Sequence, residues 1–448
     1  MRVLRSACSG WSVCGVDYST GEAKYNCQLA DSTFSFFFKE GEDDRDNADE
    51  PGHGSDDSDN LLIYIDQGGA CWDQFICIAA AETGMPVSAQ AIDRASVRYA
   101  QTTGILADRA DNPFRTWHKV FVPACAGDVL WGSNDALYPN QGIDGLPLPG
   151  IIPDPAHPND IAIHHRGFDN FLASLKWVTK HLGDKPRKVM VAGSSAGGYG
   201  AATGFAFVKE VWPDAETYLL SDAANGVIGP AFTQAVLNNP ASPWGQQANL
   251  PTWILGMADL PNTSNQFFPT FFSTLANHYA KKSASNHHYG PTKTAQYTTE
   301  WDVDQAFYFG AMQEQPIFLD LSRVFSGNGL DNTTAYYPYQ NRVYCGWHGL
   351  MDNYTNDLVN GTVNYHYYRA AGYTHTILTE TPPVVMPDGT QVSFNPKGIF
   401  YSENSAGVSF NQWIRGMLGE AGRAWENQPP NSVGGNAFPP PPNVICDP

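Results

Sequence analysis

A short apolar run leads straight into a glycine-rich turn near the middle of the chain, and this junction constrains the fold more than any other feature. The run Lys188-Val-Met-Val-Ala has the character of a buried strand, and Gly193-Ser-Ser-Ala-Gly-Gly follows it without a spacer. Small residues then continue at Ala201, Ala202 and Gly204, as expected for a helix packed closely on a sheet. A buried strand, a tight turn and a helix in direct succession predict a parallel α/β sheet.

Ser195 stands at the centre of this turn, in a Gly-x-Ser-x-Gly pattern between Gly193 and Gly197. Between a strand and a helix, this spacing is typical of a nucleophile elbow, in which a strained backbone makes the serine hydroxyl project. Glycines are needed on both sides because a β-carbon would clash there, and the N-terminus of the helix favours an oxyanion. Ser194 is one position off the pattern and is expected to point elsewhere. The alternative is a glycine-rich turn that serves packing alone.

Other segments fit the same architecture. Short apolar runs at residues 61–66, 118–123 and 217–221 predict further buried strands, and apolar residues at helical spacing predict a helix over 168–181. Strands that alternate with helices predict an α/β-hydrolase-like, doubly wound and mostly parallel sheet, with helices on both faces and long decorating loops. We expect one domain over residues 1–448, with an acidic surface loop at 40–59, a cap or decorating insertion at 229–291 and a proline-rich tail at 429–448.

A glycine-rich loop is predicted to supply an oxyanion hole. Residues Gln67-Gly-Gly-Ala-Cys-Trp follow the first buried run. In acyl transfer, the backbone N–H groups of a loop in this position bind the carbonyl oxygen of the substrate. We assign Gly69 and Ala70 as donors from this loop, and Ala196 after the serine as the remaining donor. The alternative for the loop is an ordinary tight turn.

The general base is expected among the late histidines, since chains with this elbow carry serine, acid and histidine in that order. His375 lies in a loop directly after a predicted strand, where such a histidine belongs. His348 is its rival, and His366 lies inside a strand-like run and is expected to be a framework residue.

The acid is expected between Ser195 and the histidine. Asp302 and Asp304 both follow a strand-like run, and spacing alone does not choose between them. Asp222 ends the strand after the elbow and is a third candidate. An acid at the start of a helix can also be just a cap, a role that Thr299 could take instead.

Composition excludes several classes of function. The chain has 26 Lys+Arg against 45 Asp+Glu, a net charge of −19, so phosphate would repel it and we expect no nucleic-acid partner. Aromatic residues make up 13%, enough for a large core and against disorder. No apolar run approaches the ~18 residues of a membrane span. Acidic residues such as Asp56, Asp57 and Asp59 form a solvated loop, with calcium binding as the less favoured alternative.

The cysteines favour an exported protein. Eight are present, an even number, and none has Cys-x-x-Cys spacing, so we expect no metal site and no cofactor. We predict that Cys71, Cys77 and Cys125 form disulfides that brace the oxyanion loop, because all three lie near the carboxyl ends of predicted neighbouring strands. No signal peptide is visible, so we interpret the start as a mature or trimmed N-terminus, and secretion is inferred from the cysteines and the charge.

Several motifs together resemble the pectin acetylesterase/Notum family of extracellular serine esterases, in its bacterial version. They are Gly68-Gly-Ala-Cys-Trp, Val122-Pro-Ala-Cys-Ala-Gly-Asp-Val, His165-Arg-Gly-Phe-Asp-Asn, Gly193-Ser-Ser-Ala-Gly-Gly and Asp302-Val-Asp-Gln, and the resemblance extends from about Cys14 to Leu418. The family's Asp-x-x-Gln segment implies Asp302 as the acid, and its late histidine corresponds to His375. Two departures bear on the substrate: Ala70 replaces the tryptophan of plant and animal members, and threonines replace the cysteines that flank the histidine in plant members.

The resemblance implies a secreted serine carboxylesterase that hydrolyses O-acyl esters of a polysaccharide. Acetyl is the acyl group that the resemblance favours. Ser195, His375 and Asp302 would act through an acyl-enzyme. The acidic chain disfavours polyanionic pectin, so a neutral acylated or synthetic ester is expected. The alternatives are a lipid- or polyester-directed hydrolase of the same fold, or a non-catalytic carbohydrate-binding protein that kept the fold.

Overall fold

The computed structural model describes most of the chain that surrounds the predicted motifs. The described residues are 3–4, 11–15, 34–42, 59–74, 76–77, 100–139, 160–184, 186–254, 266–313, 336–380, 384–385, 391–392, 399–401, 407–430, 438–441 and 444–446. The acidic segment with Asp56 and Asp57 lies outside these residues, as does most of the expected tail.

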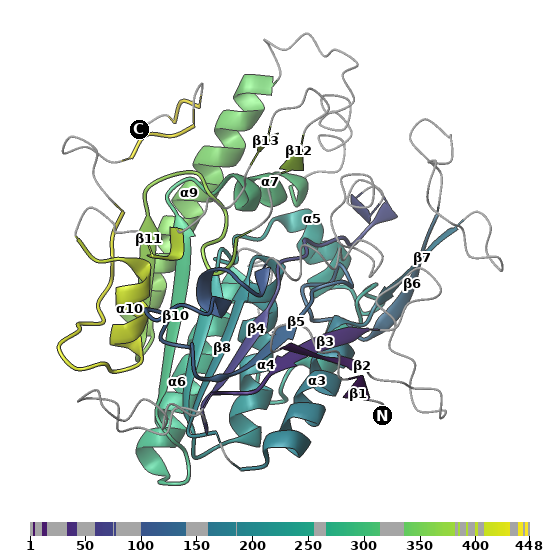
Figure 1. Cartoon of the computed structure of the whole chain (residues 1–448). Helices are drawn as coiled ribbons and strands as arrows, with labels where there is room; N and C mark the ends of the chain where they lie inside the picture. Colours follow the sequence, from purple (N-terminus) through teal and green to yellow (C-terminus); the bar gives the residue numbers. More distant parts are fainter. Residues whose placement is uncertain are drawn as a thin grey trace.

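Within the described residues, one twisted sheet of nine strands forms the centre of the molecule (Figure 1). Its order is β1-β2-β3-β5-β4-β8-β9-β10-β11. The strands from β5 to β11 in this order run parallel, whereas β1, β2 and β3 add an antiparallel edge. The sheet is therefore mostly parallel, as predicted. The bounds are β1 Val3–Leu4, β2 Trp11–Gly15, β3 Ser35–Lys39, β4 Leu61–Ile65, β5 His118–Val122, β8 Lys188–Ser194, β9 Glu216–Asp222, β10 Thr292–Thr299 and β11 Tyr365–Ala370.

Two separate two-stranded sheets lie apart from the central one. β6 (Asn134–Pro139) pairs antiparallel with β7 (Asp160–His165), and this pair projects from the side of the molecule (Figure 1). β12 (Val384–Val385) pairs antiparallel with β13 (Gln391–Val392).

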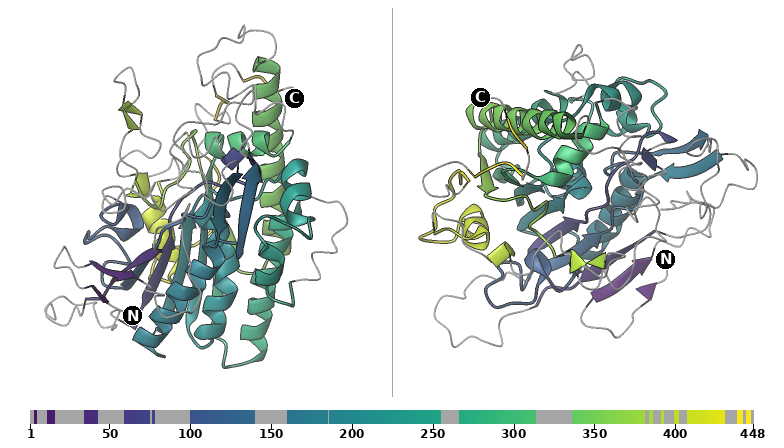
Figure 2. Two further views of the ribbon diagram at one scale, coloured as in Figure 1. Left: turned by 90° about the vertical axis from the view of Figure 1, so that its right-hand side faces the viewer. Right: turned by 90° about the horizontal axis from the view of Figure 1, so that it is seen from above.

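Helices cover both faces of the sheet because its central strands are apolar on both sides. Successive residues of β4 alternate between two cores: Ile63 joins the core beneath α3, α4 and α6, whereas Tyr64 joins the core beneath α10. Figure 2 shows α3, α4 and α6 side by side on one face. The bounds are α3 Gly167–Leu182, α4 Ala196–Val211, α6 Phe267–Ser285 and α10 Phe410–Met417.

Two further helices that bear on the site are α7 (Val303–Ala311) and the long α9 (Tyr336–Gly361) (Figure 1). They pack on each other through a small core around Trp347. Short helical turns complete the described chain: α5 Pro230–Phe232, η4 Gly104–Leu106, η5 Thr233–Leu237, η6 Gln246–Asn249 and η9 Ile399–Tyr401.

The predicted strands and the helix over 168–181 are confirmed to within one or two residues at their ends. Residues 229–291 are more than decoration, because α6 lies within them. Its aromatic face, including Phe268, Phe272 and Tyr279, is fully buried in the main core, so α6 is a layer of the fold. Because prolines and asparagines are frequent around α6, the composition of this segment resembles that of a loop and does not predict the helix.

Candidate active site

Ser195 occupies a sharp turn between β8 and α4. Its backbone has φ 54° and ψ −122°, which a non-glycine residue adopts only under strain. A β-carbon on Gly193 would lie 2.0 Å from the Gly197 carbonyl oxygen, and one on Gly197 would lie 2.3 Å from that of Ile65. Only glycine fits at either position. The turn is therefore the strained elbow that the sequence predicts, with a partly exposed serine at its tip.

His375 meets Asp302 at the ends of two neighbouring parallel strands. His375 lies in the loop after β11, and its Nδ1 is 2.8 Å and 2.9 Å from the two carboxylate oxygens of Asp302. Asp302 follows β10, is fully buried and caps α7 by accepting the N–H groups of Asp304 and Gln305. Asp302 is thus both a helix cap and the partner of His375, and Thr299 does not cap the helix.

Gln305 holds the Asp302 carboxylate in place, a role that the spacing of the motif alone did not specify. Its side-chain Nε2 lies 2.9 Å from Asp302 Oδ2 and also bonds the oxygens of Thr298 and Asn225. In return, its Oε1 accepts the backbone N–H of Asn225. The Asp-x-x-Gln pattern thus has a physical reason, since its first residue orients the histidine and its last orients the acid. Asn225 carried no signal in the sequence.

The rival histidines are engaged elsewhere. His348 lies in α9, with Nε2 2.8 Å from Glu300 and its ring stacked on Trp301 at 4.0 Å. His366 lies in β11 as expected, and its Nδ1 bonds Asn427. Asp222, the third acid candidate, is fully buried and contacts Ser194 and the chain after His375, not the imidazole.

Three neighbouring carboxylates, those of Asp302, Asp304 and Asp222, raise the pKa of His375. Burial lowers the pKa of its imidazole, but the charges of Asp302 and Asp304 and the hydrogen bond to Asp302 outweigh burial and raise the pKa to about 9. Burial also raises the pKa of Asp304. Asp304 is therefore an electrostatic neighbour of the histidine, although it is not its hydrogen-bond partner.

The predicted oxyanion loop follows β4 and is held against the loop after β5. Gly69 has φ 66°, which suits glycine, and Ala70 forms an isolated antiparallel bridge with Asp128. The N–H of Cys71 donates to the Gly127 carbonyl at 2.8 Å. The N–H of Ala70 donates to the Tyr308 hydroxyl at 3.3 Å. Ala196, the third predicted donor, is the first residue of α4, where N–H groups lack partners within the helix.

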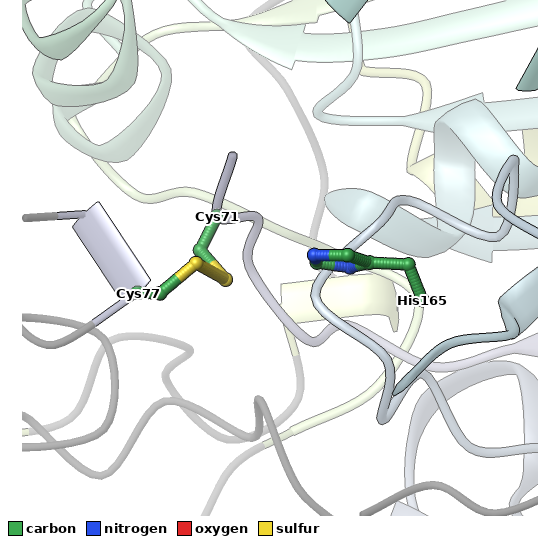
Figure 3. A group of neighbouring side chains, drawn as sticks. All are labelled: Cys71, Cys77 and His165. Carbon is green, nitrogen blue, oxygen red and sulfur yellow. A yellow bond between two sulfur atoms is a disulfide. The ribbon is translucent and has the colours of Figure 1, made fainter. Parts of the chain in front are cut away.

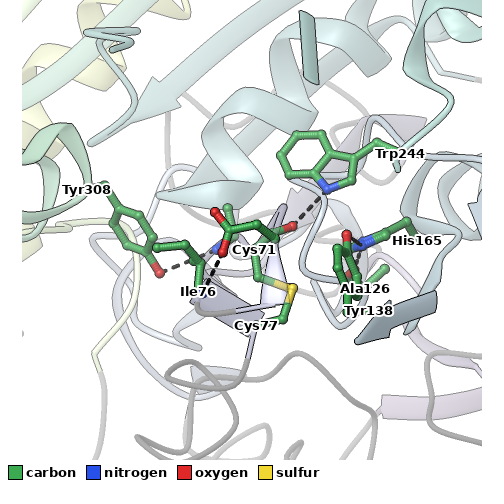
Figure 4. Close-up of a disulfide and its surroundings, with 10 residues drawn as sticks. Cys71, Ile76, Cys77, Ala126, Tyr138, His165, Trp244 and Tyr308 are labelled. Atoms are coloured by element: carbon green, nitrogen blue, oxygen red, sulfur yellow. Dashed lines mark hydrogen bonds between the residues drawn. A yellow bond between two sulfur atoms is a disulfide. The ribbon is translucent and has the colours of Figure 1, made fainter. Parts of the chain in front are cut away.

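Disulfides brace this loop, as predicted. Cys71, next to Ala70, is bonded to Cys77, and Cys125 is also disulfide-bonded. The carbonyl of Cys71 accepts the indole N–H of Trp244 at 2.8 Å, so the loop is fixed from both sides (Figure 4). A second described disulfide joins Cys345 in α9 to Cys446.

Cys71, Cys77 and His165 come close enough to suggest a metal centre, since their ligand atoms lie within 4.8 Å of one another (Figure 3). The two sulfurs are bonded to each other, however. Both nitrogens of His165 are also engaged, Nδ1 with the Ala126 carbonyl and Nε2 with the Tyr138 hydroxyl. Burial lowers the pKa of His165 to about 4, so the ring is neutral and structural. In this arrangement, the group does not hold a metal.

The Cys71–Cys77 disulfide should matter more for catalysis than for stability. We expect Cys71→Ser/Cys77→Ser to lower kcat about tenfold, because a loosened loop would misplace the N–H groups predicted as oxyanion donors. The matched control is Cys345→Ser/Cys446→Ser, which opens a far longer loop (sequence separation 101 against 6) and should lower Tm more but kcat less. Ester hydrolysis and thermal unfolding of both variants test this. Equal kcat in the two would contradict a bracing role.

The comparison with protein-family models completes the picture. Among the described helices, none is long and apolar enough to cross a membrane. A comparison with curated proteins returned no match. The pectinacetylesterase family model matches residues 50–271, about half of the chain, a stretch that holds the predicted oxyanion loop and the elbow but ends before Asp302 and His375. Together with the mostly parallel sheet, this match shows that the chain belongs to the pectinacetylesterase family and is a hydrolase of carboxylic ester bonds.

Proposed function

We propose that Ser195, His375 and Asp302 form the catalytic triad of this esterase. The observation that carries the proposal is the bond between His375 Nδ1 and the buried Asp302, in a chain whose strained elbow presents Ser195. With Nδ1–H donated to Asp302, Nε2 is the nitrogen left to act as base. Ser195 attacks the ester carbonyl while His375 takes its proton and then gives it to the leaving alcohol. Water hydrolyses the acyl-enzyme by the same route.

The amides of Gly69, Ala70 and Ala196 are the donors to the tetrahedral oxyanion. Each such donor contributes about 3 kcal/mol to stabilising the transition state in comparable sites. The Ala70 N–H is engaged by the Tyr308 hydroxyl in the free protein. The oxyanion takes over this N–H during the reaction, which means that the Tyr308 side chain borders the acyl carbonyl.

The substrate that fits best is an O-acetyl ester of a neutral polysaccharide. The family acts on acyl esters, but this chain carries a net charge of −19, and Asp304 lies close enough to His375 to raise its pKa. A polyuronate would meet both charges, whereas a neutral glycan would not. Disulfides and a family that is typically extracellular support secretion.

Hydrolysis of p-nitrophenyl esters from acetyl to palmitoyl tests the function, with organophosphate labelling in parallel. We expect the highest kcat/KM with acetate and covalent label on Ser195. A preference for palmitate would favour the lipid-directed alternative. Absence of both hydrolysis and label would favour a carbohydrate-binding protein.

The pH profile gives a separate expectation. His375 acts as a base only when neutral, so kcat/KM should rise as pH increases through its pKa. A free histidine would place this rise near about 6.5. The neighbouring carboxylates raise the pKa of His375 to about 9, so the rise should fall on the alkaline side of neutrality.

Asp304→Asn removes one of these charges and lowers the pKa, so the rise should move down by roughly one pH unit. The profile of kcat/KM against pH, measured for both proteins, decides this. An unchanged midpoint in Asp304→Asn would show that Asp304 does not act on the imidazole.

A further inference from the structure

Asp222 contacts both halves of the proposed site, although it is not the acid of the triad. It ends β9, the strand between the one that carries Ser195 and the one that precedes Asp302. Its carboxylate accepts the Ser194 hydroxyl at 2.7 Å and the backbone N–H groups of Ile377 and Leu378, each at 3.0 Å from Oδ2. Those two amides lie two and three residues after His375 in the chain.

The backbone of Asp222 makes a second connection to the elbow. Its carbonyl accepts the N–H of Ser195 at 2.8 Å, so one residue bonds the nucleophile's own amide and the histidine loop. Tyr64 of β4 also connects the elbow to the loop after His375. Its hydroxyl lies 3.2 Å from Ser194 Oγ and 2.9 Å from Thr379 Oγ1. Elbow and histidine loop are thus joined twice through fully buried groups.

We infer that Asp222 is a positioning residue that sets the distance between Ser195 and His375, acting through its bonds to the elbow and to the loop after the histidine. The inference rests on the proposed triad. The bond to Asp302 fixes the direction of the His375 ring, and bonds from Thr299 and Ile105 hold the loop after β11 to neighbouring segments, but none of these bonds reaches the elbow. Asp222 supplies a direct connection between the loop and the elbow.

A carboxylate suits this task because it only accepts hydrogen bonds, and here it faces one hydroxyl and two amides. An asparagine has the same shape and its oxygen can occupy the position of Oδ2, but its NH₂ group would then face the N–H of Ile377, which lies 3.3 Å from Oδ1, and push it away. Burial raises the pKa of Asp222 to about 7, even though its hydrogen bonds lower it, so the group is a carboxylate in the alkaline range where His375 is a base.

The test compares Asp222→Asn with the wild-type enzyme on p-nitrophenyl acetate. We expect kcat to fall roughly 10²-fold with KM within threefold, as for a misplacement of about 1 Å between reacting groups. The midpoint of the pH profile should move down, and the low-field proton resonance of His375 Nδ1–H should broaden or vanish. Asp128→Asn is the matched control, since Asp128 is also fully buried and accepts three backbone N–H groups, none of which belongs to the elbow or to the loop after β11. It should lower Tm but leave the pH midpoint and the resonance in place.

Tyr64→Phe keeps the inference testable if Asp222→Asn does not fold. It removes the hydroxyl that contacts Ser194 and Thr379 and leaves the buried charge of Asp222 in place. We expect kcat to fall about tenfold with little change in KM. A kcat within twofold of wild type in Tyr64→Phe, or within threefold in Asp222→Asn, overturns the inference. Organophosphate labelling of wild-type Ser195 distinguishes failure of the triad from failure of the positioning role. If Ser195 is labelled but Asp222→Asn has normal kcat, only the positioning role is refuted. If Ser195 is not labelled, the triad itself is refuted.

Discussion

Ser195→Ala is expected to abolish ester hydrolysis, with a loss in kcat of about 10⁶ as for nucleophiles in other serine hydrolases. The folded protein should remain, with Tm within about 2 °C of wild type, because removing one partly exposed hydroxyl on a strained turn costs little stability. Steady-state hydrolysis of p-nitrophenyl acetate and thermal unfolding measure the two quantities.

The adjacent serine provides a sharp control. Ser194 is fully buried and its hydroxyl bonds Asp222, so Ser194→Ala should lower Tm yet keep measurable turnover. Retention of more than a few per cent of the wild-type rate in Ser195→Ala would move the nucleophile to another residue.

Asp302→Asn should cost about 10⁴ in kcat and leave the fold intact. An asparagine can still cap α7 through its oxygen, but it no longer holds Nδ1–H of His375 in the tautomer that leaves Nε2 free. Asp304→Asn should cost far less, because Asp304 acts on the histidine through charge and makes no hydrogen bond with it among the described contacts. Single-turnover rates of both variants, at a pH above the pKa of His375, isolate the chemical step.

The opposite ranking would be decisive. If Asp304→Asn is the inactive variant and Asp302→Asn the active one, the acid assignment is wrong. In that event, His375 must be weighed again against His348, whose imidazole already bonds the carboxylate of Glu300.

The sequence predicted the strands and the elbow because both are local patterns. A continuous apolar run identifies β4, β5, β8 and β9, and Gly193 and Gly197 mark a turn that no larger residue fits. The choice between Asp302 and Asp304 was not local. The directions in which the side chains of Asp302 and Asp304 point depend on where α7 begins. Asp302 itself sets that start, because it caps the helix.

Contacts between distant segments escaped prediction for the same reason. The bond from Ala70 to Tyr308 joins residues 238 positions apart, and the bonds from Asp222 to Ile377 and Leu378 join residues more than 150 apart. Neither has a spacing that a pattern could reveal. The family resemblance points to Asp302 as the acid because its motif also contains Gln305, which contacts the Asp302 carboxylate.

The order of the strands has a consequence for how activity arises during synthesis and folding. Ser195 and Asp302 follow β8 and β10, but His375 follows β11, the last parallel strand, which docks beside β10 from Thr294↔Tyr365 to Thr299↔Ala370. Parallel pairing of this kind joins distant parts of the chain and is slow to form. A growing chain therefore contains the proposed nucleophile before the proposed base. With the proposed triad, hydrolysis requires β11 to be paired with β10, so esterase activity would report that this strand has joined the sheet.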